Sequence, residues 1–293
     1  MKKSKLGRYQ AMMGYLFISP TMLLFLAFTI IPIIMAFYLS FTNYDVFSPI
    51  KMVGLDNYRR LLKDDLLWLT FKNVFYYVLL YVPANLIISL FLALLLNSKF
   101  KTAGVFRALT YMPTLTSAVA ASTIWLWLLH PEFGLINELL SKFHIVGPAW
   151  LAQTSTAMIS VVMVTLWQSV GSNMIVYLAG LQGVPEYLYE SAKLDGAGWW
   201  AQFWYVTLPG LRPTTFFVST MSIIGSLQIF DQAYVLTQGG PANATKTVVY
   251  HIYQQGFGQL QMGYASAMAF VLALAILIVS IINMRINKEG ALI

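Results

Sequence analysis

Residues 184–213 read VPEYLYESAKLDGAGWWAQFWYVTLPGLRP, the longest polar-containing interval in the second half of a very apolar chain. Pro185 suits the first turn of a helix, where no amide donor is needed, and acids follow it at the positive end of the helix dipole. Gly196 tolerates the left-handed conformation that closes helices, so the first helix ends there. A second short helix follows and ends before Pro209. The stretch is therefore predicted to form two short helices joined by a glycine turn.

The composition of the whole chain indicates an integral membrane protein. Of its 293 residues, 58% are hydrophobic and only 10% are charged, whereas soluble domains carry about a quarter charged residues. The net charge of +7 could suggest nucleic-acid binding, but the basic residues are spread thinly at the ends of apolar runs, where membrane orientation explains them better. The chain has no cysteine, which excludes a disulfide framework and a thiolate metal site.

Six apolar runs are long enough to cross a bilayer, which takes about 20 residues. The first run follows a basic N-terminus and could be read as a signal peptide. It is longer than the roughly 7–15 residues of a cleavable apolar region, and no small-residue cleavage site follows it. We therefore expect an all-helical protein with six transmembrane helices. The expected spans are Tyr15–Phe41, Phe71–Leu96, Val105–Leu129, Thr156–Leu181, Thr214–Leu236 and Tyr264–Met284.

The distribution of basic residues predicts that both termini are cytoplasmic. Segments on the inner side of this topology hold eleven of the eighteen Lys and Arg residues, and excess positive charge marks the cytoplasmic side. The eleven are Lys2, Lys3, Lys5, Arg8, Lys99, Lys101, Arg107, Lys193, Arg212, Arg285 and Lys288. The seven on the outer side are Lys51, Arg59, Arg60, Lys63, Lys72, Lys142 and Lys246. The same topology places residues 184–213 in the cytoplasm.

The cytoplasmic stretch resembles the EAA loop of ABC importer membrane subunits. That pattern is Glu-Ala-Ala, three residues, Gly, nine residues, an aliphatic residue, one residue, then Leu-Pro. This chain matches it from Glu190 to Pro209 and has Asp195 before the glycine. One position departs from the pattern, because Ser191 stands where alanine is usual. An ordinary amphipathic loop between two spans is the alternative, but six positions hold register over twenty residues.

Two further segments resemble the carbohydrate-type permeases of this group. Residues 54–58 read Gly-Leu-Asp-Asn-Tyr, like the segment after the first span of those permeases. Residues 236–241 read Leu-Thr-Gln-Gly-Gly-Pro and, with Thr245 and residues 250–257, are similar to their last outer loop. On the physics of the residues alone, the first segment is simply a helix at the membrane surface.

The resemblance implies the fold, function and partners of the chain. It implies a type I importer permease fold with a tail, first span and outer segment in residues 1–70, and a five-helix core in residues 71–293 that contains the loop at 184–213. The expected function is carbohydrate import across the cytoplasmic membrane of a prokaryote. A non-identical second permease subunit, two cytoplasmic ATPase subunits and an extracytoplasmic solute-binding protein would complete the importer. The residues expected to couple it to the ATPase are Glu190, Ser191, Ala192, Asp195, Gly196, Leu208 and Pro209.

The chain itself shows no sign of being an enzyme or of binding a cofactor. It contains no Gly-x-x-x-x-Gly-Lys phosphate loop and no Gly-x-Ser-x-Gly nucleophile elbow. Its three histidines are not paired at metal-ligand spacing. A membrane enzyme acting on lipids would need a reactive cluster at the end of a span, and none is found. A secondary carrier is the other alternative, but such carriers commonly show internal repeats and none is evident here.

Polar side chains inside the spans mark a candidate solute path. The fourth span carries four of them at i, i+3, i+4 and i+7, which is one face of a helix. The fifth span has two serines one turn apart with a glutamine beside them, and the third span has a similar pair. The candidate residues are Thr165, Gln168, Ser169 and Ser172; Ser222, Ser226 and Gln228; and Thr114 and Ser117.

Structural roles compete with this interpretation of the polar residues. Isolated Ser and Thr residues let helices pack closely and bond to backbone carbonyls, and we favour that role where they stand alone. Gln168 and Asp231 favour function, because an intramembrane amide or acid is costly unless it faces water or a partner. Trp167 could stack on a sugar ring or pack in the core, whereas Trp125 and Trp127 fit an interfacial belt.

Cysteine labelling tests the expected topology in this cysteine-free chain. A single cysteine at Asn57 should react with an impermeant thiol reagent added outside intact spheroplasts. One at Gln202 should react only from the cytoplasmic side. Swapped labelling would invert the topology and remove residues 184–213 from the reach of an ATPase.

Overall fold

The computed structural model describes residues 5–97 and 102–288, and the regular elements of this part are all helices. Within this part of the chain the one isolated β-bridge pairs Thr42 with Met52. The predicted all-helical class is confirmed. Four basic residues used to predict the topology lie outside the described residues: Lys2, Lys3, Lys99 and Lys101.

The helices belong to two compact units, one formed by Met1–Asp64 with Ile252–Val271 and one by Asp65–His251 with Leu272–Ile293. The first unit contains α1 (Lys5–Phe25), π-helix η1 (Leu26–Ile30), α2 (Ile31–Leu39), α3 (Asp56–Leu62) and π-helix η4 (Gln254–Gly258). The second contains α4 (Asp65–Leu96), α5 (Ala103–Tyr111), 3-10 helix η2 (Met112–Leu115), α6 (Ala118–Leu128), α7 (Leu135–Lys142), α8 (Thr154–Gln182), α9 (Glu186–Leu194), α10 (Trp199–Gln202), π-helix η3 (Phe203–Thr207), α11 (Leu208–Gly210), α12 (Arg212–Leu227) and α13 (Asp231–Thr237). Two helices contribute residues to both units: α14 (Val248–Tyr253) and α15 (Met262–Lys288).

In the first unit, the Gly-Leu-Asp-Asn-Tyr motif closes the end of α2. The Asn57 Nδ2 amide donates to the carbonyl oxygens of Ser40 and Thr42, each at 2.8 Å. Tyr58 shares a 2.8 Å hydrogen bond with the Ser40 hydroxyl. The last carbonyls of a helix have no intrahelical donor, so these bonds satisfy them. The motif therefore has a structural role here, and a labelling cysteine is better placed at the exposed Phe47 than at Asn57.

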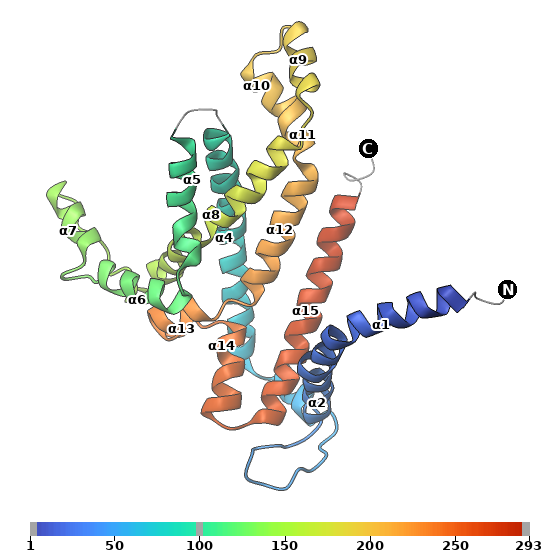
Figure 1. The fold of residues 1–293 in the computed structure, drawn as a ribbon. Helices are drawn as coiled ribbons and strands as arrows, with labels where there is room; N and C mark the ends of the chain where they lie inside the picture. The colour runs from blue at the N-terminus through green and yellow to red at the C-terminus, as the bar shows by residue number, and fades with distance from the viewer. Residues whose placement is uncertain (1–4, 98–101, 289–293) are drawn as a thin grey trace. The chain divides into compact units, whose positions relative to one another are not determined.

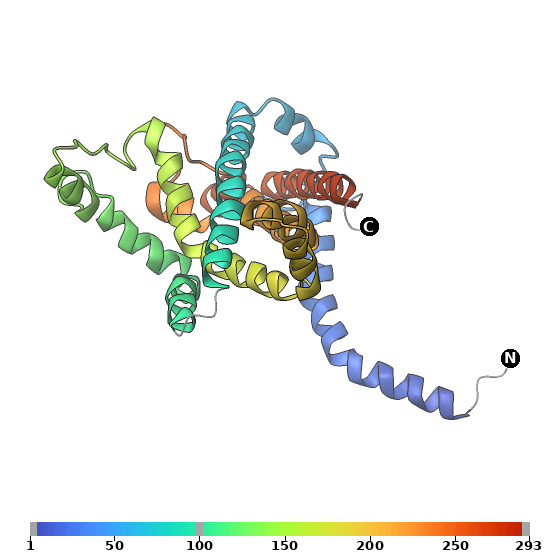
Figure 2. The ribbon, with the colours of Figure 1, turned by 90° about the horizontal axis from the view of Figure 1, so that it is seen from above.

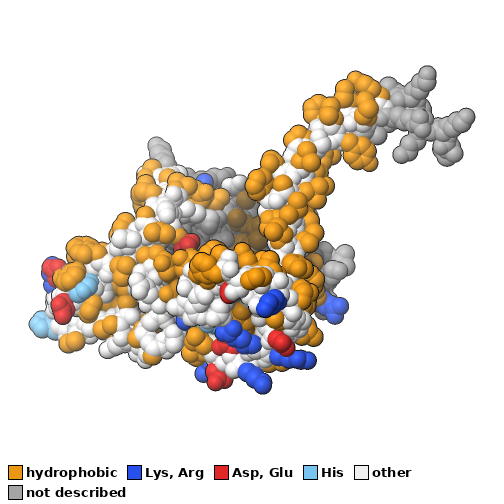
Figure 3. Space-filling view, turned by 90° about the horizontal axis from the view of Figure 1, so that it is seen from below, with side chains coloured by type: hydrophobic (Ala, Val, Ile, Leu, Met, Phe, Trp, Pro, Cys, Tyr) orange, Lys and Arg blue, Asp and Glu red, His pale blue; other side chains and the backbone are white. Residues whose placement is uncertain are grey.

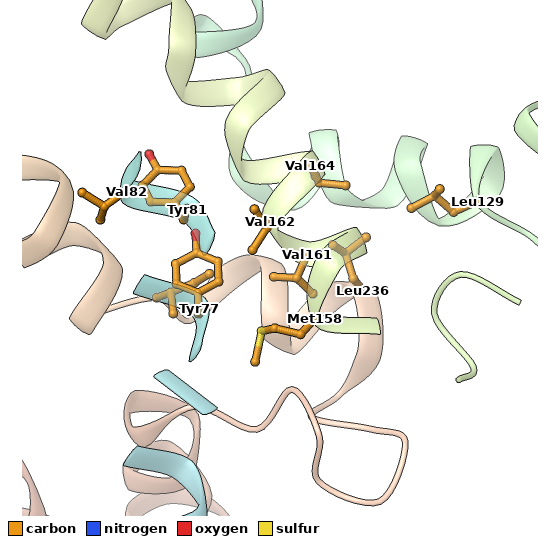
Figure 4. Packing of buried hydrophobic residues seen from close by; sticks show 10 residues of the cluster. Tyr77, Tyr81, Val82, Leu129, Met158, Val161, Val162, Val164 and Leu236 are labelled. Carbon is orange, nitrogen blue, oxygen red and sulfur yellow. The ribbon is translucent and has the colours of Figure 1, made fainter. Parts of the chain in front are cut away.

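The core of the second unit lies where α4 packs against α8 and α12. Figure 2 shows α4 beside α8, with α6 and α7 extending away from them. Figure 4 shows how the apolar side chains of α4, α8 and α13 meet. The buried members of this cluster include Tyr77, Tyr81, Met158, Val161, Val164 and Leu236. A second cluster nearer the other end of α8 includes Met174, Tyr177, Leu211 and Val218.

Four helices of the described part are long and apolar enough to cross a membrane, namely Met12–Leu39, Asp65–Leu96, Thr154–Gln182 and Met262–Arg285. The pair α12 and α13 would make a fifth, although it bends by 48°. Figure 3 shows hydrophobic side chains over much of one end of the molecule, with one group of charged side chains low in the view and a smaller group at its left edge. Many large hydrophobic side chains of the long helices are exposed, such as Phe28, Phe75 and Ile87, which fits a protein surrounded by lipid.

The expected third span, Val105–Leu129, is not one continuous helix. The structure breaks it into α5, the 3-10 helix η2 and α6. Pro113 lies within the break, and Thr116 and Ser117 have extended backbone with ψ of 146° and 137°. Proline lacks an amide donor and its ring crowds the preceding turn, so the α-helix ends near it. Thr114 and Ser117 therefore do not share a helical face, which corrects that prediction.

A short helix, α3, lies between the first two apolar spans and is followed closely by α4. Leu61 and Leu62 belong to α3, which ends at Leu62, whereas Leu66 and Leu67 belong to α4. Helix α4 begins at Asp65, six residues before the expected start of the second span at Phe71. The acid at the start of α4 suits the positive end of its dipole.

Close packing of α5 on α8 depends on Gly171. A Cβ atom at this position would fall on the backbone of Thr110 and Tyr111. We expect Gly171→Ala to destabilise the protein by about 1–3 kcal/mol through overpacking. Gly104→Ala on α5 is the matched control, because an added Cβ there meets nothing within 4 Å. Thermal denaturation of the purified importer should show a lower midpoint for the first variant only; equal midpoints would contradict this packing.

Candidate functional site

A cavity of about 330 Å³ opens in the second unit. Its walls come from α4, α8 and α12 and from the bend between α12 and α13. The side chains around it are mainly hydroxyls, amides and aromatic rings. They belong to Tyr77, Tyr81, Thr165, Asn173, Met221, Ser222, Ser226, Gln228, Ile229, Phe230, Asp231 and Gln232, and the backbone of Gly225 completes the wall.

Four of the residues predicted for the solute path line this cavity, and they come from two different helices. Thr165 belongs to α8, whereas Ser222, Ser226 and Gln228 belong to α12 and the bend that follows it. Asp231, which the sequence marked as a costly intramembrane acid, lines it as well. Opposition of α8 and α12 across a polar space is what the sequence pattern led us to expect.

The remaining residues of the α8 stripe lie behind the cavity wall. Ser169 accepts a 2.8 Å hydrogen bond from the hydroxyl of Tyr81 and donates one of 2.8 Å to the carbonyl of Thr165. Ser172 donates to the carbonyl of Ser169 at 2.8 Å. The Gln168 carboxamide reaches the cavity indirectly, because its Oε1 accepts a 3.0 Å bond from Gln232. The stripe thus supports the wall, and only Thr165 belongs to the lining.

Gln168 also joins α8 to the break in the third span. The side-chain Nε2 of Gln168 donates to the backbone carbonyl of Thr116 at 3.0 Å, and the backbone carbonyl of Gln168 accepts from the Thr114 hydroxyl at 2.8 Å. Neither Thr114 nor Ser117 lines the cavity. Trp167 does not line it either and pairs edge to face with Trp125 at 5.6 Å. These residues pack the region around the break, where backbone groups freed from helical bonding need partners.

Sequence reasoning missed a fully buried amide that holds α4 to α12. The Asn85 Nδ2 donates to the Ser222 hydroxyl at 2.9 Å, and its Oδ1 accepts from Ser89 at 3.2 Å. Ser89 also contacts the carbonyl of Val170 on α8 at 3.3 Å. An asparagine two residues after Pro83 in an apolar span was a visible signal, since buried intramembrane amides need partners. Tyr81, Asn173 and Gln232 were also missed.

The loop at residues 184–213 forms the two short helices that the sequence predicted. Helix α9 closes at Gly196, whose φ is +79°. The Ala197 amide donates to the carbonyl of Ala192 at 2.8 Å, and the Gly196 amide donates to that of Lys193 at 3.0 Å. This pair of bonds is a Schellman motif, in which the residue after the C-cap takes the left-handed conformation. The spacing from Ala192 to Gly196 is therefore the spacing of a helix stop.

The returning arm of the loop differs from the prediction at Pro209. The helix does not end before this residue, because α10 continues as the π-helix η3 into α11 at Leu208. Pro209 occupies the first turn of α11, where a missing amide donor is tolerated. A 3.1 Å bond between the hydroxyls of Tyr189 and Thr207 ties the two arms together.

The tip of the loop is exposed and rich in aromatic side chains. Helices α9 and α10 project beyond the ends of α8 and α12 (Figure 1). Glu190, Ser191, Asp195 and Gly196 are exposed there, and Ala192 is half-buried. Trp199 stacks on Phe203 with ring centroids 5.7 Å apart. The loop thus presents an acidic and aromatic surface on a hairpin of fixed shape.

The Leu-Thr-Gln-Gly-Gly-Pro motif forms a compact loop after α13. Asn73 on α4 donates to the carbonyls of Asn243 and Lys246 at 2.7 and 3.0 Å. Thr245 donates to the carbonyl of Gly240 at 2.7 Å. Gly239 has a φ of +80°, and a Cβ there would come within 2.9 Å of the Tyr250 ring. The glycine is thus required by both backbone conformation and space.

Comparison with known proteins identifies the family. Residues 70–289 match the model of the family described as binding-protein-dependent transport system inner membrane component. The chain is 37% identical over 296 residues to the probable ABC transporter permease protein YesP of Bacillus subtilis, covering 99% of this chain and 94% of that one. It is also 37% identical over 279 residues to the arabinooligosaccharides transport system permease protein AraP of the same organism, covering 93% and 88%.

Solved structures show the same fold. A bacterial ABC transporter involved in the import of the acidic polysaccharide alginate contains a chain with a TM-score of 0.85, 22% identity and 96% coverage of both chains. A second structure, of the bacterial alginate ABC transporter with an alginate pentasaccharide-bound periplasmic protein, gives a TM-score of 0.84 at 22% identity and the same coverage. The family resemblance drawn from the loop at residues 184–213 is confirmed.

Proposed function

Since this chain belongs to the family of binding-protein-dependent transport system inner membrane components, we propose that its cavity forms part of a path for carbohydrates. The observation that carries the proposal is the cavity itself, in which polar residues of α8 face those of α12. A lining made mostly of hydroxyls and amides suits a sugar, which offers many hydroxyl groups. The relative AraP is named for arabinooligosaccharides, which supports this substrate class.

The proposal includes the partners and topology expected from the sequence. A second, non-identical permease subunit would close the cavity, and an extracytoplasmic binding protein would deliver the solute, as the periplasmic protein bound to the alginate transporter suggests. Two ATPase subunits would hydrolyse ATP. Six spans with cytoplasmic termini would place α9 and α10 in contact with an ATPase. In this arrangement residues 1–70 precede a core formed by residues 71–293.

The coupling role of the loop follows from its shape. Glu190 and Asp195 are exposed near the tip, so they can pair with basic residues of an ATPase. The Schellman turn at Gly196 and the bond between Tyr189 and Thr207 make the hairpin stiff. A stiff hairpin transmits a displacement to α8 and α12, the helices that line the cavity. The alternative function is that of a secondary carrier. Such a carrier has no use for this loop, and membership of this family does not favour that function.

Two substitutions test the solute path. Gln168→Ala removes the partner of Gln232, and Ser226→Leu fills the cavity. We expect both variants to weaken uptake several-fold or to change preference between two related sugars, while the importer still assembles and hydrolyses ATP. Ser172→Ala is the matched control, because Ser172 bonds to a carbonyl of its own helix outside the lining. Loss of assembly with unchanged preference would support packing roles instead.

A pair of glycine variants tests the coupling loop. Gly196→Ala places a side chain at a φ of +79°, which costs an L-residue about 1–2 kcal/mol. Gly198→Ala is the control, because Gly198 has a φ of −69°. An added Cβ meets nothing within 4 Å at either position, so only the backbone conformation differs. Transport driven by ATP should fall in the first variant, and fall further in Gly196→Leu, with membrane insertion intact. Native transport by Gly196→Leu would exclude the loop as the coupling element.

A further inference from the structure

The cavity wall carries a negative side chain but no positive one among the described residues. Among the described residues that line it, none is Lys, Arg or His, whereas Asp231 contributes a carboxyl group. Asp231 is exposed and forms no salt bridge with a described residue. A carboxylate at the edge of a partly apolar space is less screened than one in bulk water, so it repels anions over several ångström. The chain's own wall therefore disfavours a negatively charged solute.

Three hydroxyl groups of the wall are also one-sided, because their protons are already used. Thr165 donates to the carbonyl of Val161 at 2.9 Å, and Ser226 donates to that of Ser222 at 2.6 Å. Carbonyl oxygens can only accept, so both directions are certain. Tyr81 donates to the Ser169 hydroxyl, whose own proton is used on another carbonyl. These lining hydroxyls consequently offer oxygen lone pairs to a solute.

We propose that this cavity selects uncharged, hydroxyl-rich solutes over anionic ones, and that Asp231 is the residue that sets the selectivity. A neutral sugar brings an O–H donor with each hydroxyl to these acceptor hydroxyls and to the Asp231 carboxylate. A uronate, sulfonate or phosphate brings acceptor oxygens and a negative charge to the same wall. The inference rests on the proposed function and narrows its substrate to neutral carbohydrates. We do not infer an acidic substrate for this chain from the alginate transporter, because a likeness at 22% identity shows only a shared fold.

The experiment measures how fast charged and neutral reagents enter the cavity. The chain has no cysteine, so Gly225→Cys places a single thiol in the wall, where an added Cβ meets nothing within 4 Å. The assembled importer, with cysteine-free partner subunits, is treated with three methanethiosulfonate reagents of similar size. They carry a neutral hydroxyethyl, a cationic aminoethyl or an anionic sulfonatoethyl group. Ser155→Cys is the control, because Ser155 is exposed in the first turn of α8.

The expected result is a charge preference that depends on Asp231. Normalised to Ser155→Cys, the anionic reagent should modify Gly225→Cys about tenfold more slowly than the neutral one, which corresponds to about 1.4 kcal/mol. The cationic reagent should be at least as fast as the neutral one. Adding Asp231→Asn should remove most of the difference without changing the neutral rate.

Other outcomes overturn specific parts of the inference. Equal rates for all three reagents would refute charge selection while leaving the cavity on an aqueous path. A preference that persists with Asp231→Asn would refute the assignment to Asp231. No reaction at Gly225→Cys with any reagent, with Ser155→Cys reactive, would refute the proposed path itself. Met221→Cys, at an exposed position of the same wall, repeats the measurement if Gly225→Cys does not assemble.

Discussion

Hydrocarbon offers no hydrogen bonds, and this constraint governs how polar side chains are arranged in the spans of this protein. Asn85 is completely buried in α4, and both ends of its amide are bonded, to Ser222 of α12 and to Ser89 of its own helix. Ser89 in turn contacts a carbonyl of α8. A single buried amide therefore links three helices. Leaving any of these groups without a partner in an apolar setting would cost about 1–3 kcal/mol, so the three helices are held in one register.

The same constraint gives the cavity its chemical character. Serine and threonine hydroxyls in an apolar helix satisfy themselves by donating to the carbonyl one turn earlier, as Thr165 and Ser226 do. Once that proton is used, only oxygen lone pairs remain for a solute. The bonding that stabilises these helices in lipid thus also leaves these two hydroxyls of the wall as acceptors. Gln168 accepts a hydrogen bond from the lining residue Gln232 and donates one to the carbonyl of Thr116, at the break in the third span.

Outside the spans, the loop at residues 184–213 depends on local backbone geometry. Gly196 takes a left-handed conformation and Ala192 accepts the bond that closes α9. The return through a π-helix brings Thr207 to Tyr189 and delivers the chain to the first turn of α11 with Pro209 in a tolerated position. These contacts close the hairpin at its turn and between its two arms. Its two ends are continuous with α8 and α12, which carry the polar residues of the cavity. The loop and the cavity wall are therefore connected through the covalent chain.

The sequence by itself determined the membrane class, the long apolar helices, the glycine-closed hairpin and the polar stripe on α8, because these depend on composition, periodicity and local turn chemistry. It also predicted the family, since the loop spacing is a local pattern. Only the tertiary structure decided which polar residues line the cavity: Thr165 lines it and Ser172 does not, because helix rotation is set by packing against α4 and α12. It also decided that the run Val105–Leu129 breaks near Pro113. Proline is tolerated inside many membrane helices, and its effect depends on whether neighbouring helices supply partners for the freed backbone groups. Here Gln168 supplies one of them, through Thr116, and no local pattern could have shown that contact.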